Sequence, residues 1–549
     1  MKRRTSSRWL AIAAVGIGAV AMPVVSGAAK PQAAAGGGEL IDGSTFPQGT
    51  PAHLEPALNA ELDSYQVVRA MYDGLTDIDT ITDPAAPATV PHQAESYETN
   101  EDATVWTFTL REGLTFADGE AILPSSYVRS WERAASLGGD YSYLFDFIEG
   151  GAEFRAGEGD SLTGVVADDE AMTLTVTLSA PYANFDAVAG FQVFRPVPEA
   201  AVASAENYEN ELMVGSGAYT MEAPRNDQEI VLVKNDAWGG DFSGNTWETR
   251  PDRIVFLISA DVDTSFNSME AGETMSASVP AGRAQDARDN WGSSLDVIQL
   301  ASYHFIFNYR DERVGGEANV LLRQAISQAI DREAINEAIF NGMRVLSTGI
   351  TPPGIPGFQE NICDYCGYDP AAAEAAFGEW TAAGNAQDGP LPIQFNDGGV
   401  HNGVVDIIVE NLAAVGIEAV PDPQPSEGYF SDFLGGGGAV FARVGWIADY
   451  PTYDNFTYDI FGTASLDLNN YGYSNPAFDD LVAEAKSTTD PEIRNGLFNE
   501  AEELLLNTDV MAVPINWYVG DLAWDESKVE GFYQDVLGLV HFEAITVVG

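Results

Sequence analysis

The sequence predicts an α/β protein of several domains, with a strand-rich α+β unit in its N-terminal half and an α/β arrangement in its C-terminal half. Its 549 residues are enough for several domains with substantial cores. Hydrophobic residues make up 45% of the chain, too many for a disordered acidic polypeptide. The hydrophobic pattern changes along the chain from alternation to helical spacing, which separates the two halves.

Alternating apolar residues predict two strands in the N-terminal half, each with one apolar face. A helix that opens at Pro124 lies between them and carries Tyr127, Val128 and Trp131. The apolar faces of the strands are formed by Trp106, Phe108 and Leu110 in the first and by Met172, Leu174, Val176 and Leu178 in the second.

A βαβ pattern follows in the C-terminal half. Residues 391–395 predict a strand, a helix ends before Gly416, and residues 417–420 predict the next strand. The stripe of that helix is formed by Val404, Ile408, Leu412 and Val415. An earlier amphipathic helix carries Leu322, Ala325, Ile326, Ala329 and Ile330.

Two further helices are predicted from an N-cap residue followed by proline, at Asn475 and at Asp490. The second of these helices carries Ile493, Leu497, Ala501, Leu504 and Leu505. The C-terminal half is therefore expected to be α/β.

The charge balance argues against a nucleic-acid-binding protein. The chain has 26 Lys and Arg against 83 Asp and Glu, a formal net charge of −57. Such a charge repels phosphate backbones, and beyond the first ten residues no basic cluster offsets it. The scattered acids indicate a solvated acidic surface.

The N-terminus predicts export. A basic head, an apolar run from Trp9 to Val25 and small residues after it are typical of a secretory signal, here residues 1–28. The alternative is a retained N-terminal anchor. Residues 29–38 form a flexible lead, and the absence of cysteine near the cleavage region argues against a lipid anchor. The expected location is periplasmic or extracellular.

The only cysteines, Cys363 and Cys366, are most simply interpreted as a local disulfide that pins a loop outside the cytosol. A thioredoxin-like redox centre would require the pair to open a helix after a strand, whereas a Pro/Gly-rich loop precedes it. A zinc site would need two more ligands, and the five histidines are scattered. We expect no metal and no cofactor.

No catalytic motif stands out. The patterns Gly-x-Ser-x-Gly, His-Glu-x-x-His and Gly-x-x-x-x-Gly-Lys-Ser/Thr are absent, and the run Gly435 to Gly438 lacks the lysine of a phosphate-binding loop. That run is interpreted as a flexible turn into a strand over residues 439–446. The chain is not expected to be an enzyme.

One segment combines binding groups at a predicted strand end. The apolar strand ends in Trp446-Ile447-Ala448-Asp449-Tyr450, where open α/β sheets bind ligands. Composition alone would make Trp446 a core aromatic residue and Asp449 a cap or loop acid. Arg443, three residues before Trp446, falls on the opposite face of a regular strand.

Seven stretches along the chain form a recognisable set. They are 94–97 (AESY), 105–113 (VWTFTLREG), 116–119 (FADG), 214–219 (VGSGAY), 323–333 (RQAISQAIDRE), 442–450 (ARVGWIADY) and 473–479 (YSNPAFD). Together these stretches resemble the extracellular solute-binding protein family 5, the peptide-binding proteins of ABC importers, and most of all its oligopeptide binders. The likeness runs in the family's order from about residue 40 to the C-terminus.

The resemblance implies a periplasmic-binding-protein type II clamshell, with two α/β lobes and an additional α+β domain. Lobe I would combine residues 39–72, 200–298 and 515–549. The extra domain II would be 73–199, and lobe III would be 299–514.

The resemblance also implies a peptide site. Asp449 would pair with the α-ammonium of the peptide, and Trp446 would wall a side-chain pocket. The backbone of Gly445 to Ile447 would pair with the extended peptide. The remaining implied contacts are Arg443 and Arg310 at the peptide C-terminus, the opposing backbone of Ala60, Glu61 and Leu62, and Tyr141 or Tyr143 near the ammonium.

The expected function is therefore the substrate-binding component of an ABC importer, a monomer that delivers peptides to a membrane permease. One alternative is a non-peptide solute such as a nickel chelate or a sugar in the same fold. A secreted hydrolase built on the clamshell is the other.

Overall fold

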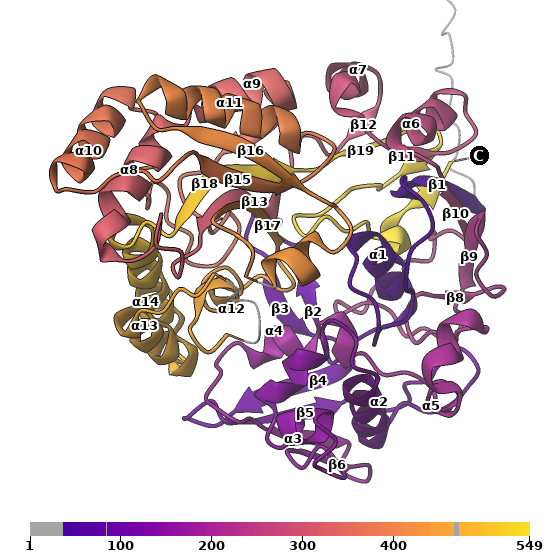
Figure 1. Cartoon of the computed structure of the whole chain (residues 1–549). Coiled ribbons are helices and arrows are strands. Elements are labelled where there is room, and N and C mark those ends of the chain that lie inside the picture. The colour runs from indigo at the N-terminus through magenta and orange to yellow at the C-terminus, as the bar shows by residue number, and fades with distance from the viewer. Residues whose placement is uncertain (1–36, 84, 436, 466–470, 549) are drawn as a thin grey trace, which may run out of the picture.

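The computed structural model describes residues 37–83, 85–435, 437–465 and 471–548. Two large sheets and a smaller four-stranded sheet lie around a common centre (Figure 1). The predicted signal peptide, residues 1–28, lies outside the described residues, as does most of the predicted lead, residues 29–38.

The seven-stranded sheet has the order β12-β19-β11-β1-β10-β9-β8. β1 runs parallel to β10 and β11, and the other neighbours are antiparallel. Its strands are β1 Glu39–Phe46, β8 Tyr219–Met221, β9 Glu229–Lys234, β10 Arg253–Ile258, β11 Ser276–Ser278, β12 Gly292–Ser293 and β19 Leu522–Trp524. The helices packed on it are α1 Leu62–Met71, α6 Val262–Glu270 and α7 Ala284–Asn290.

The four-stranded sheet is antiparallel throughout, in the order β4-β5-β7-β6. Burial alternates along β5, where Trp106, Phe108 and Leu110 face the core as predicted. Its strands are β4 Ala94–Thr99, β5 Val105–Leu110, β6 Val165–Asp168 and β7 Thr173–Thr177. Around it lie α2 Pro124–Leu137, α3 Gly151–Arg155, α4 Phe185–Ala189, α5 Glu199–Ser204 and the pair β2 Thr76–Asp79 with β3 Ala88–Pro91.

The six-stranded sheet has the order β14-β18-β13-β17-β15-β16. β15 runs parallel to β16 and β17, and α11 connects β15 to β16, so the predicted βαβ unit is confirmed. Its strands are β13 Ile298–Phe307, β14 Val345–Leu346, β15 Leu391–Asn396, β16 Ala419–Gln424, β17 Phe441–Ile447 and β18 Ala512–Val519. Its helices are α8 Val320–Ala329, α9 Arg332–Phe340, α10 Pro370–Ala382 and α11 His401–Ala414.

Three helices complete this part of the chain, α12 Tyr458–Phe461, α13 Pro476–Ser487 and α14 Pro491–Glu503. The predicted caps are confirmed. The Asn475 side chain accepts a hydrogen bond from the Ala477 N–H at 2.9 Å, and Asp490 accepts from the Glu492 N–H at 3.0 Å. Proline occupies the first turn of both helices. Near the C-terminus, β20 Val529–Glu530 pairs with β21 Thr546–Val547.

Three details of the sequence prediction were wrong. Met172 has φ +54° and belongs to the turn before β7, so it does not share that strand's face. Ile493 is 58% exposed, and the buried face of α14 uses Phe498 instead. Leu504 and Leu505 lie beyond α14 in a wider π turn, Leu504–Thr508.

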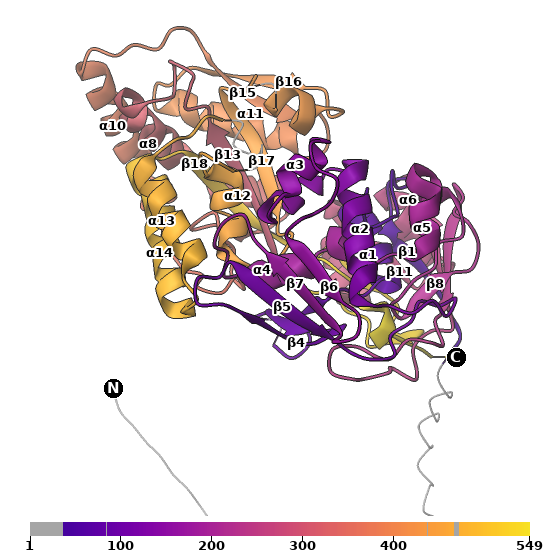
Figure 2. The same ribbon diagram turned by 90° about the horizontal axis from the view of Figure 1, so that it is seen from below.

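The seven- and six-stranded sheets are joined by two adjacent crossings of the chain. Residues 294–298 lead into β13, and residues 519–522 lead from β18 to β19. The Gly520 N–H donates to the Val297 carbonyl at 2.9 Å, which ties the crossings together. A Cβ at Gly520 would lie 2.4 Å from Ser294 Oγ, so the close approach requires glycine. Figure 2 shows the four-stranded sheet between these two bodies from below.

The domain boundaries expected from the resemblance can be compared with the sheets. The seven-stranded sheet draws its strands from residues 39–46, 219–293 and 522–524. The boundary expected between residues 514 and 515 falls inside β18, whose eight residues all belong to a strand of the six-stranded sheet. The boundaries themselves stay a prediction.

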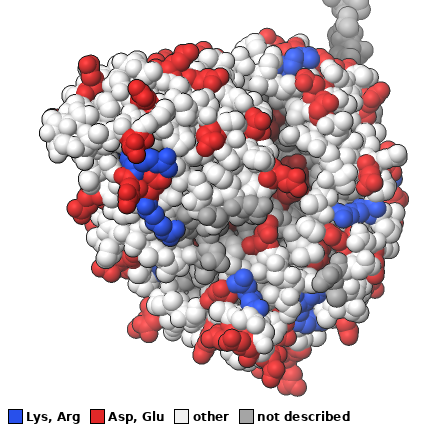
Figure 3. Space-filling model, viewed as in Figure 1, with Lys and Arg blue, Asp and Glu red and all other residues white. Residues whose placement is uncertain are grey.

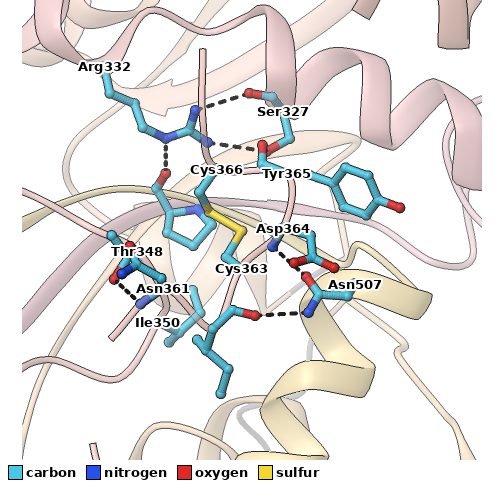
Figure 4. The surroundings of a disulfide bond; sticks show 12 residues. Ser327, Arg332, Thr348, Ile350, Asn361, Cys363, Asp364, Tyr365, Cys366 and Asn507 are labelled. Carbon is cyan, nitrogen blue, oxygen red and sulfur yellow. Dashed lines mark hydrogen bonds between the residues drawn. A yellow bond between two sulfur atoms is a disulfide. The ribbon is translucent and has the colours of Figure 1, made fainter. Parts of the chain in front are cut away.

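The disulfide prediction is confirmed. Cys363 and Cys366 are bonded, with their Cα atoms 5.5 Å apart, in the loop between β14 and α10 (Figure 4). Asn507 brackets the loop, since its amide donates to the Ile362 carbonyl at 2.8 Å and its Oδ1 accepts from the Asp364 N–H at 2.8 Å. Neither cysteine opens a helix, so the arrangement is that of a pinned loop.

The surface is acidic on the face that Figure 3 shows. Asp and Glu side chains are scattered over all parts of this face, and Lys and Arg are few among them. This distribution agrees with the net charge of −57.

Candidate functional site

Strand β17 leaves part of its backbone unpaired. It pairs with β13 along its whole length, Phe441–Ile447, but with β15 only at Phe441 and Ala442. The edge of residues 445–447 that faces away from β13 therefore has no strand partner in the part of the chain that the structure describes. Such an edge presents N–H and C=O groups to which an extended chain can add.

Asn455 fixes the loop that follows β17. Its Oδ1 accepts from Trp446 Nε1–H at 2.9 Å and from the Asp449 N–H at 3.1 Å. Its amide donates to Asp459 Oδ2 at 2.9 Å and more weakly to Asp449 Oδ2 at 3.4 Å. One side chain thus sets the position of both the indole and the carboxylate.

A pocket of about 480 Å³ of empty space lies where four parts of the chain meet. Its walls come from the start of α1, from the chain around the four-stranded sheet, from the end of β17 with the loop after it and, at Leu537, from the C-terminal segment. Six residues expected at the site from the sequence line it together: Asp449, Ile447, Ala60, Glu61, Leu62 and Tyr141. The other lining residues are Tyr65, Phe191, Gln192, Ala448 and Leu537.

Asp449 is the acidic group on the six-stranded-sheet side of this pocket. Burial, and then the negative charge of Asp459, raise the pKa of the Asp449 carboxyl to about 7, while hydrogen bonds from Asn455 and Tyr141 partly oppose this. Within the described residues, Asp449 forms no ion pair. A ligand cation would therefore find a partly desolvated carboxylate without a competing protein partner.

Tyr141 and Tyr143 lie beside Asp449, on the side of the four-stranded sheet. Tyr141 packs edge-on against Phe191 with ring centres 4.8 Å apart, and the Tyr143 ring is 6.4 Å from that of Tyr141. Burial, and then the charge of Asp449, hold the pKa values of both phenols well above the usual range. Both hydroxyls stay protonated. Tyr141 lines the pocket, whereas Tyr143 is not among its lining residues.

Arg443 and Trp446 lie on opposite faces of β17, whose pairing with β13 is regular. Arg443 is 7% exposed. Its Nη1 donates to Asn396 Oδ1 at 3.2 Å and its Nη2 to Tyr518 Oη at 3.1 Å. Gly445 lies beside this guanidinium, since a Cβ there would be 3.1 Å from Arg443 Nη2.

Arg310 does not join these residues. It follows the end of β13 that is far from Asp449, and its exposed side chain covers Gly472. A role for Arg310 at the same ligand has no geometric support here.

Sequence reasoning missed several residues of the pocket. Phe191, Gln192 and Leu537 line it from remote positions without a motif, and Asn455 holds the loop beside it. The local signal at Asn455 was only an amide six residues after Asp449, which many loops have. Among the described residues, no group of three or more His, Cys, Asp or Glu side chains is placed to hold a metal ion.

The architecture is that of type II periplasmic binding proteins, and comparisons with known proteins agree. Residues 88–466 match the family described as "Bacterial extracellular solute-binding proteins, family 5 Middle". This match spans more than half of the chain. The chain belongs to this family of extracellular solute-binding proteins. The sequence motifs had already indicated that the chain resembles it.

Named relatives include peptide-binding proteins. The chain is 24% identical over 507 residues to the dipeptide-binding protein DppE of Bacillus subtilis (strain 168), covering 89% of each chain. It is 28% identical over 486 residues to the periplasmic oligopeptide-binding protein OppA of Escherichia coli (strain K12), covering 85% of each.

Solved structures support the fold. The Escherichia coli murein tripeptide-binding protein MppA superposes with a TM-score of 0.75 at 22% identity, covering 93% of this chain and 99% of that one. Haemophilus influenzae OppA in complex with RPPGFSPFR gives a TM-score of 0.73 at 22% identity, with the same coverage. No helix in the described part of this chain is long and apolar enough to span a membrane.

Proposed function

We propose that this protein is the substrate-binding component of an ABC importer, which captures peptides outside the cytoplasmic membrane and passes them to a membrane permease. The observation that carries the proposal is the unpaired edge of β17 next to the unpaired carboxylate of Asp449. An extended peptide offers both complements, a main-chain edge for β17 and an α-ammonium for Asp449. The names of the relatives point to the same ligand class.

The proposed residue roles combine this geometry with the family resemblance. Asp449 pairs with the α-ammonium and Tyr141 supports it from the opposite side. The backbone of residues 445–447 pairs with the peptide, and residues 60–62 face it across the pocket. The apolar lining of Leu62, Phe191 and Leu537 receives the first side chain, Trp446 walls the neighbouring space, and Arg443 receives the C-terminal carboxylate.

The same proposal includes four further points: export, cleavage of residues 1–28, the lack of a lipid anchor and a monomeric state. The proposed role of the protein is ligand binding, and no cofactor or metal takes part in it. A non-peptide solute is the second candidate, because relatives of similar identity are named as deoxycholate- and heme-binding proteins.

The test is mass spectrometry of the ligand released from the purified protein by mild denaturation, followed by calorimetry of ligand-free protein with a peptide library. Peptides that are released and then bind again intact support the proposal. A bound sterol, heme, sugar or metal chelate with no peptide affinity would replace it, and cleaved peptides would identify a hydrolase.

A further inference from the structure

Two guanidinium groups share one tyrosine on the six-stranded sheet. Arg443 of β17 donates to Tyr518 Oη at 3.1 Å, and the Arg344 Cζ atom lies 4.1 Å from the centre of the same ring. Arg344 comes directly before the edge strand β14, and Tyr518 belongs to β18. The Arg443 Cζ atom also lies 4.8 Å from the ring centre of Tyr303 on β13. The group therefore extends across the sheet from β14 to β17.

Neither guanidinium has an acidic partner. Within the described ranges, no carboxylate lies within ion-pair distance of Arg344 or Arg443, and the Arg344 guanidinium makes no hydrogen bond. Arg344 Nη1 and Arg443 Nε are buried without a partner. Arg443 donates only to two neutral groups, an amide and a phenol. Buried positive charge without a counter-ion is costly, so a bound anion would stabilise this arrangement.

Two other buried arginines show the partners that such a side chain usually has. Arg332 donates to the carbonyls of Pro514, Ser327 and Ile330 at 2.6, 3.0 and 3.2 Å. Arg69 pairs with Glu543 at 3.0 Å. Arg344 and Arg443 differ from these two because they are neighbours on one tyrosine and, in a protein with 83 acidic residues, neither has a carboxylate or backbone-carbonyl partner among the described residues.

The neighbouring titratable groups do not neutralise this charge. His401, whose Nδ1 lies 2.9 Å from Tyr303 Oη, has its pKa lowered to about 4 by burial and then by Arg443. The same two causes lower the pKa of His304 to about 3, so both imidazoles are neutral at pH 7. Asp521 acts on Arg344 from beyond ion-pair distance, and burial raises the pKa of that carboxyl.

Arg344 is also held in place before any ligand binds. Asn336 donates to the Arg344 carbonyl at 2.8 Å and accepts from the Arg344 N–H at 3.0 Å. The guanidinium then stacks on Tyr518. A cation fixed in this way loses little freedom when an anion arrives, which favours binding.

We propose that Arg344 and Arg443 form a dicarboxylate subsite that selects peptides ending in Asp or Glu. The α-carboxylate binds Arg443 and the carboxylate of the last side chain binds Arg344, with Tyr518 between the two cations. The inference rests on the proposed function, because it concerns the far end of the same peptide, and it makes Arg344 the residue that determines specificity there.

The test compares Ala-Ala-Glu with Ala-Ala-Gln, and the matching tetra- and pentapeptides, by calorimetry on ligand-free protein. The wild type should bind the best-fitting Glu peptide about 10- to 100-fold more tightly than its Gln partner, the range of one charge-assisted hydrogen-bonded contact. Arg344→Gln should abolish that ratio while changing the affinity for the Gln peptide less than about threefold. Arg344→Lys should keep part of the ratio.

Arg313→Gln is the matched control, because it removes one exposed guanidinium that pairs with Asp311 outside the site. It should preserve the ratio, and melting curves without ligand should show that all variants fold. Equal affinity for the Glu and Gln peptides, or a ratio that survives Arg344→Gln, overturns the inference but leaves peptide binding intact. If no peptide of either kind binds, both this inference and the proposed function are wrong.

Discussion

Replacing Asp449 by asparagine removes one charge from the pocket and very little else. The amide keeps the shape of the carboxyl group and can still accept the hydrogen bond from Tyr141. The neighbouring Asn455 continues to hold the loop, since it contacts the Asp449 N–H and Trp446. Any loss of ligand affinity in this variant therefore reports on charge.

The size of the loss follows from the environment of the carboxylate. Asp449 is half-buried, has no ion-pair partner among the described residues and lies near the second acid Asp459. Removing one member of a desolvated charge pair costs about 3 to 5 kcal/mol, and partial exposure reduces this to about 2 to 4 kcal/mol. We expect Asp449→Asn to weaken binding of a free peptide by about 30- to 1000-fold.

Calorimetry at pH 7.5 provides the assay, because most Asp449 carboxyls, with a pKa of about 7, are then ionised. Most peptide α-amino groups, with a pKa of about 7.7 to 8.0, are still protonated at that pH. N-acetylated peptides lack the ammonium, so they should bind the wild type weakly and lose little on substitution. The four measurements form a double-mutant cycle whose coupling free energy isolates the charge pair. If Asp449→Asn binds free peptides as tightly as the wild type, Asp449 is an ordinary loop acid and the assigned role is wrong.

Three further predictions concern pH, shape and the disulfide. Because a bound ammonium stabilises the ionised form of Asp449, peptide affinity should be greatest near pH 7.5, between the pKa of Asp449 and that of the peptide α-amino group, and fall by about tenfold per pH unit below pH 7; a flat affinity profile from pH 7.5 to 5 would contradict this. Small-angle scattering should show a smaller radius of gyration when ligand-free protein is saturated with peptide, since enclosing the ligand requires the lobes to close, and an unchanged radius would count against closure. Thiol titration of the unfolded, unreduced protein should find no free thiol, and the double variant Cys363→Ser, Cys366→Ser should lose no more than roughly 2 kcal/mol of unfolding free energy because the bridged loop is short. Two reactive thiols would refute the first statement, and unfolding of the double variant at room temperature the second.

Local signals predicted local structure well. The caps Asn475 and Asp490 and the stop at Gly416 each depend on backbone groups within a few residues, and the structure has them where expected. The prediction that Ile493 is buried was wrong, because helical spacing identifies an apolar position but not whether another element covers it. The prediction that Met172 belongs to the strand was wrong, because a turn residue in the left-handed region can continue an alternating sequence pattern without continuing the strand.

The site was predictable only in part. The motif around Asp449 was visible because the loop after β17 is contiguous in the chain. Phe191, Gln192 and Leu537 reach the pocket through the packing of separate parts of the chain, and no spacing rule connects them to Asp449. Arg344 was equally invisible, since its significance lies in having no acceptor, which only the folded structure reveals.

Gly520, at the crossing between the two large sheets, offers a way to change the angle between these sheets in the ligand-free protein. Any side chain at position 520 would meet Ser294 at 2.4 to 2.6 Å, so alanine there acts as a wedge between the two crossing segments. Neither Gly520 nor Ser294 lines the ligand pocket, so the wedge adds no contact inside it, and we expect it to change how far apart the pocket walls rest. Gly520→Ala therefore separates the cost of moving the walls from the strength of the contacts they make.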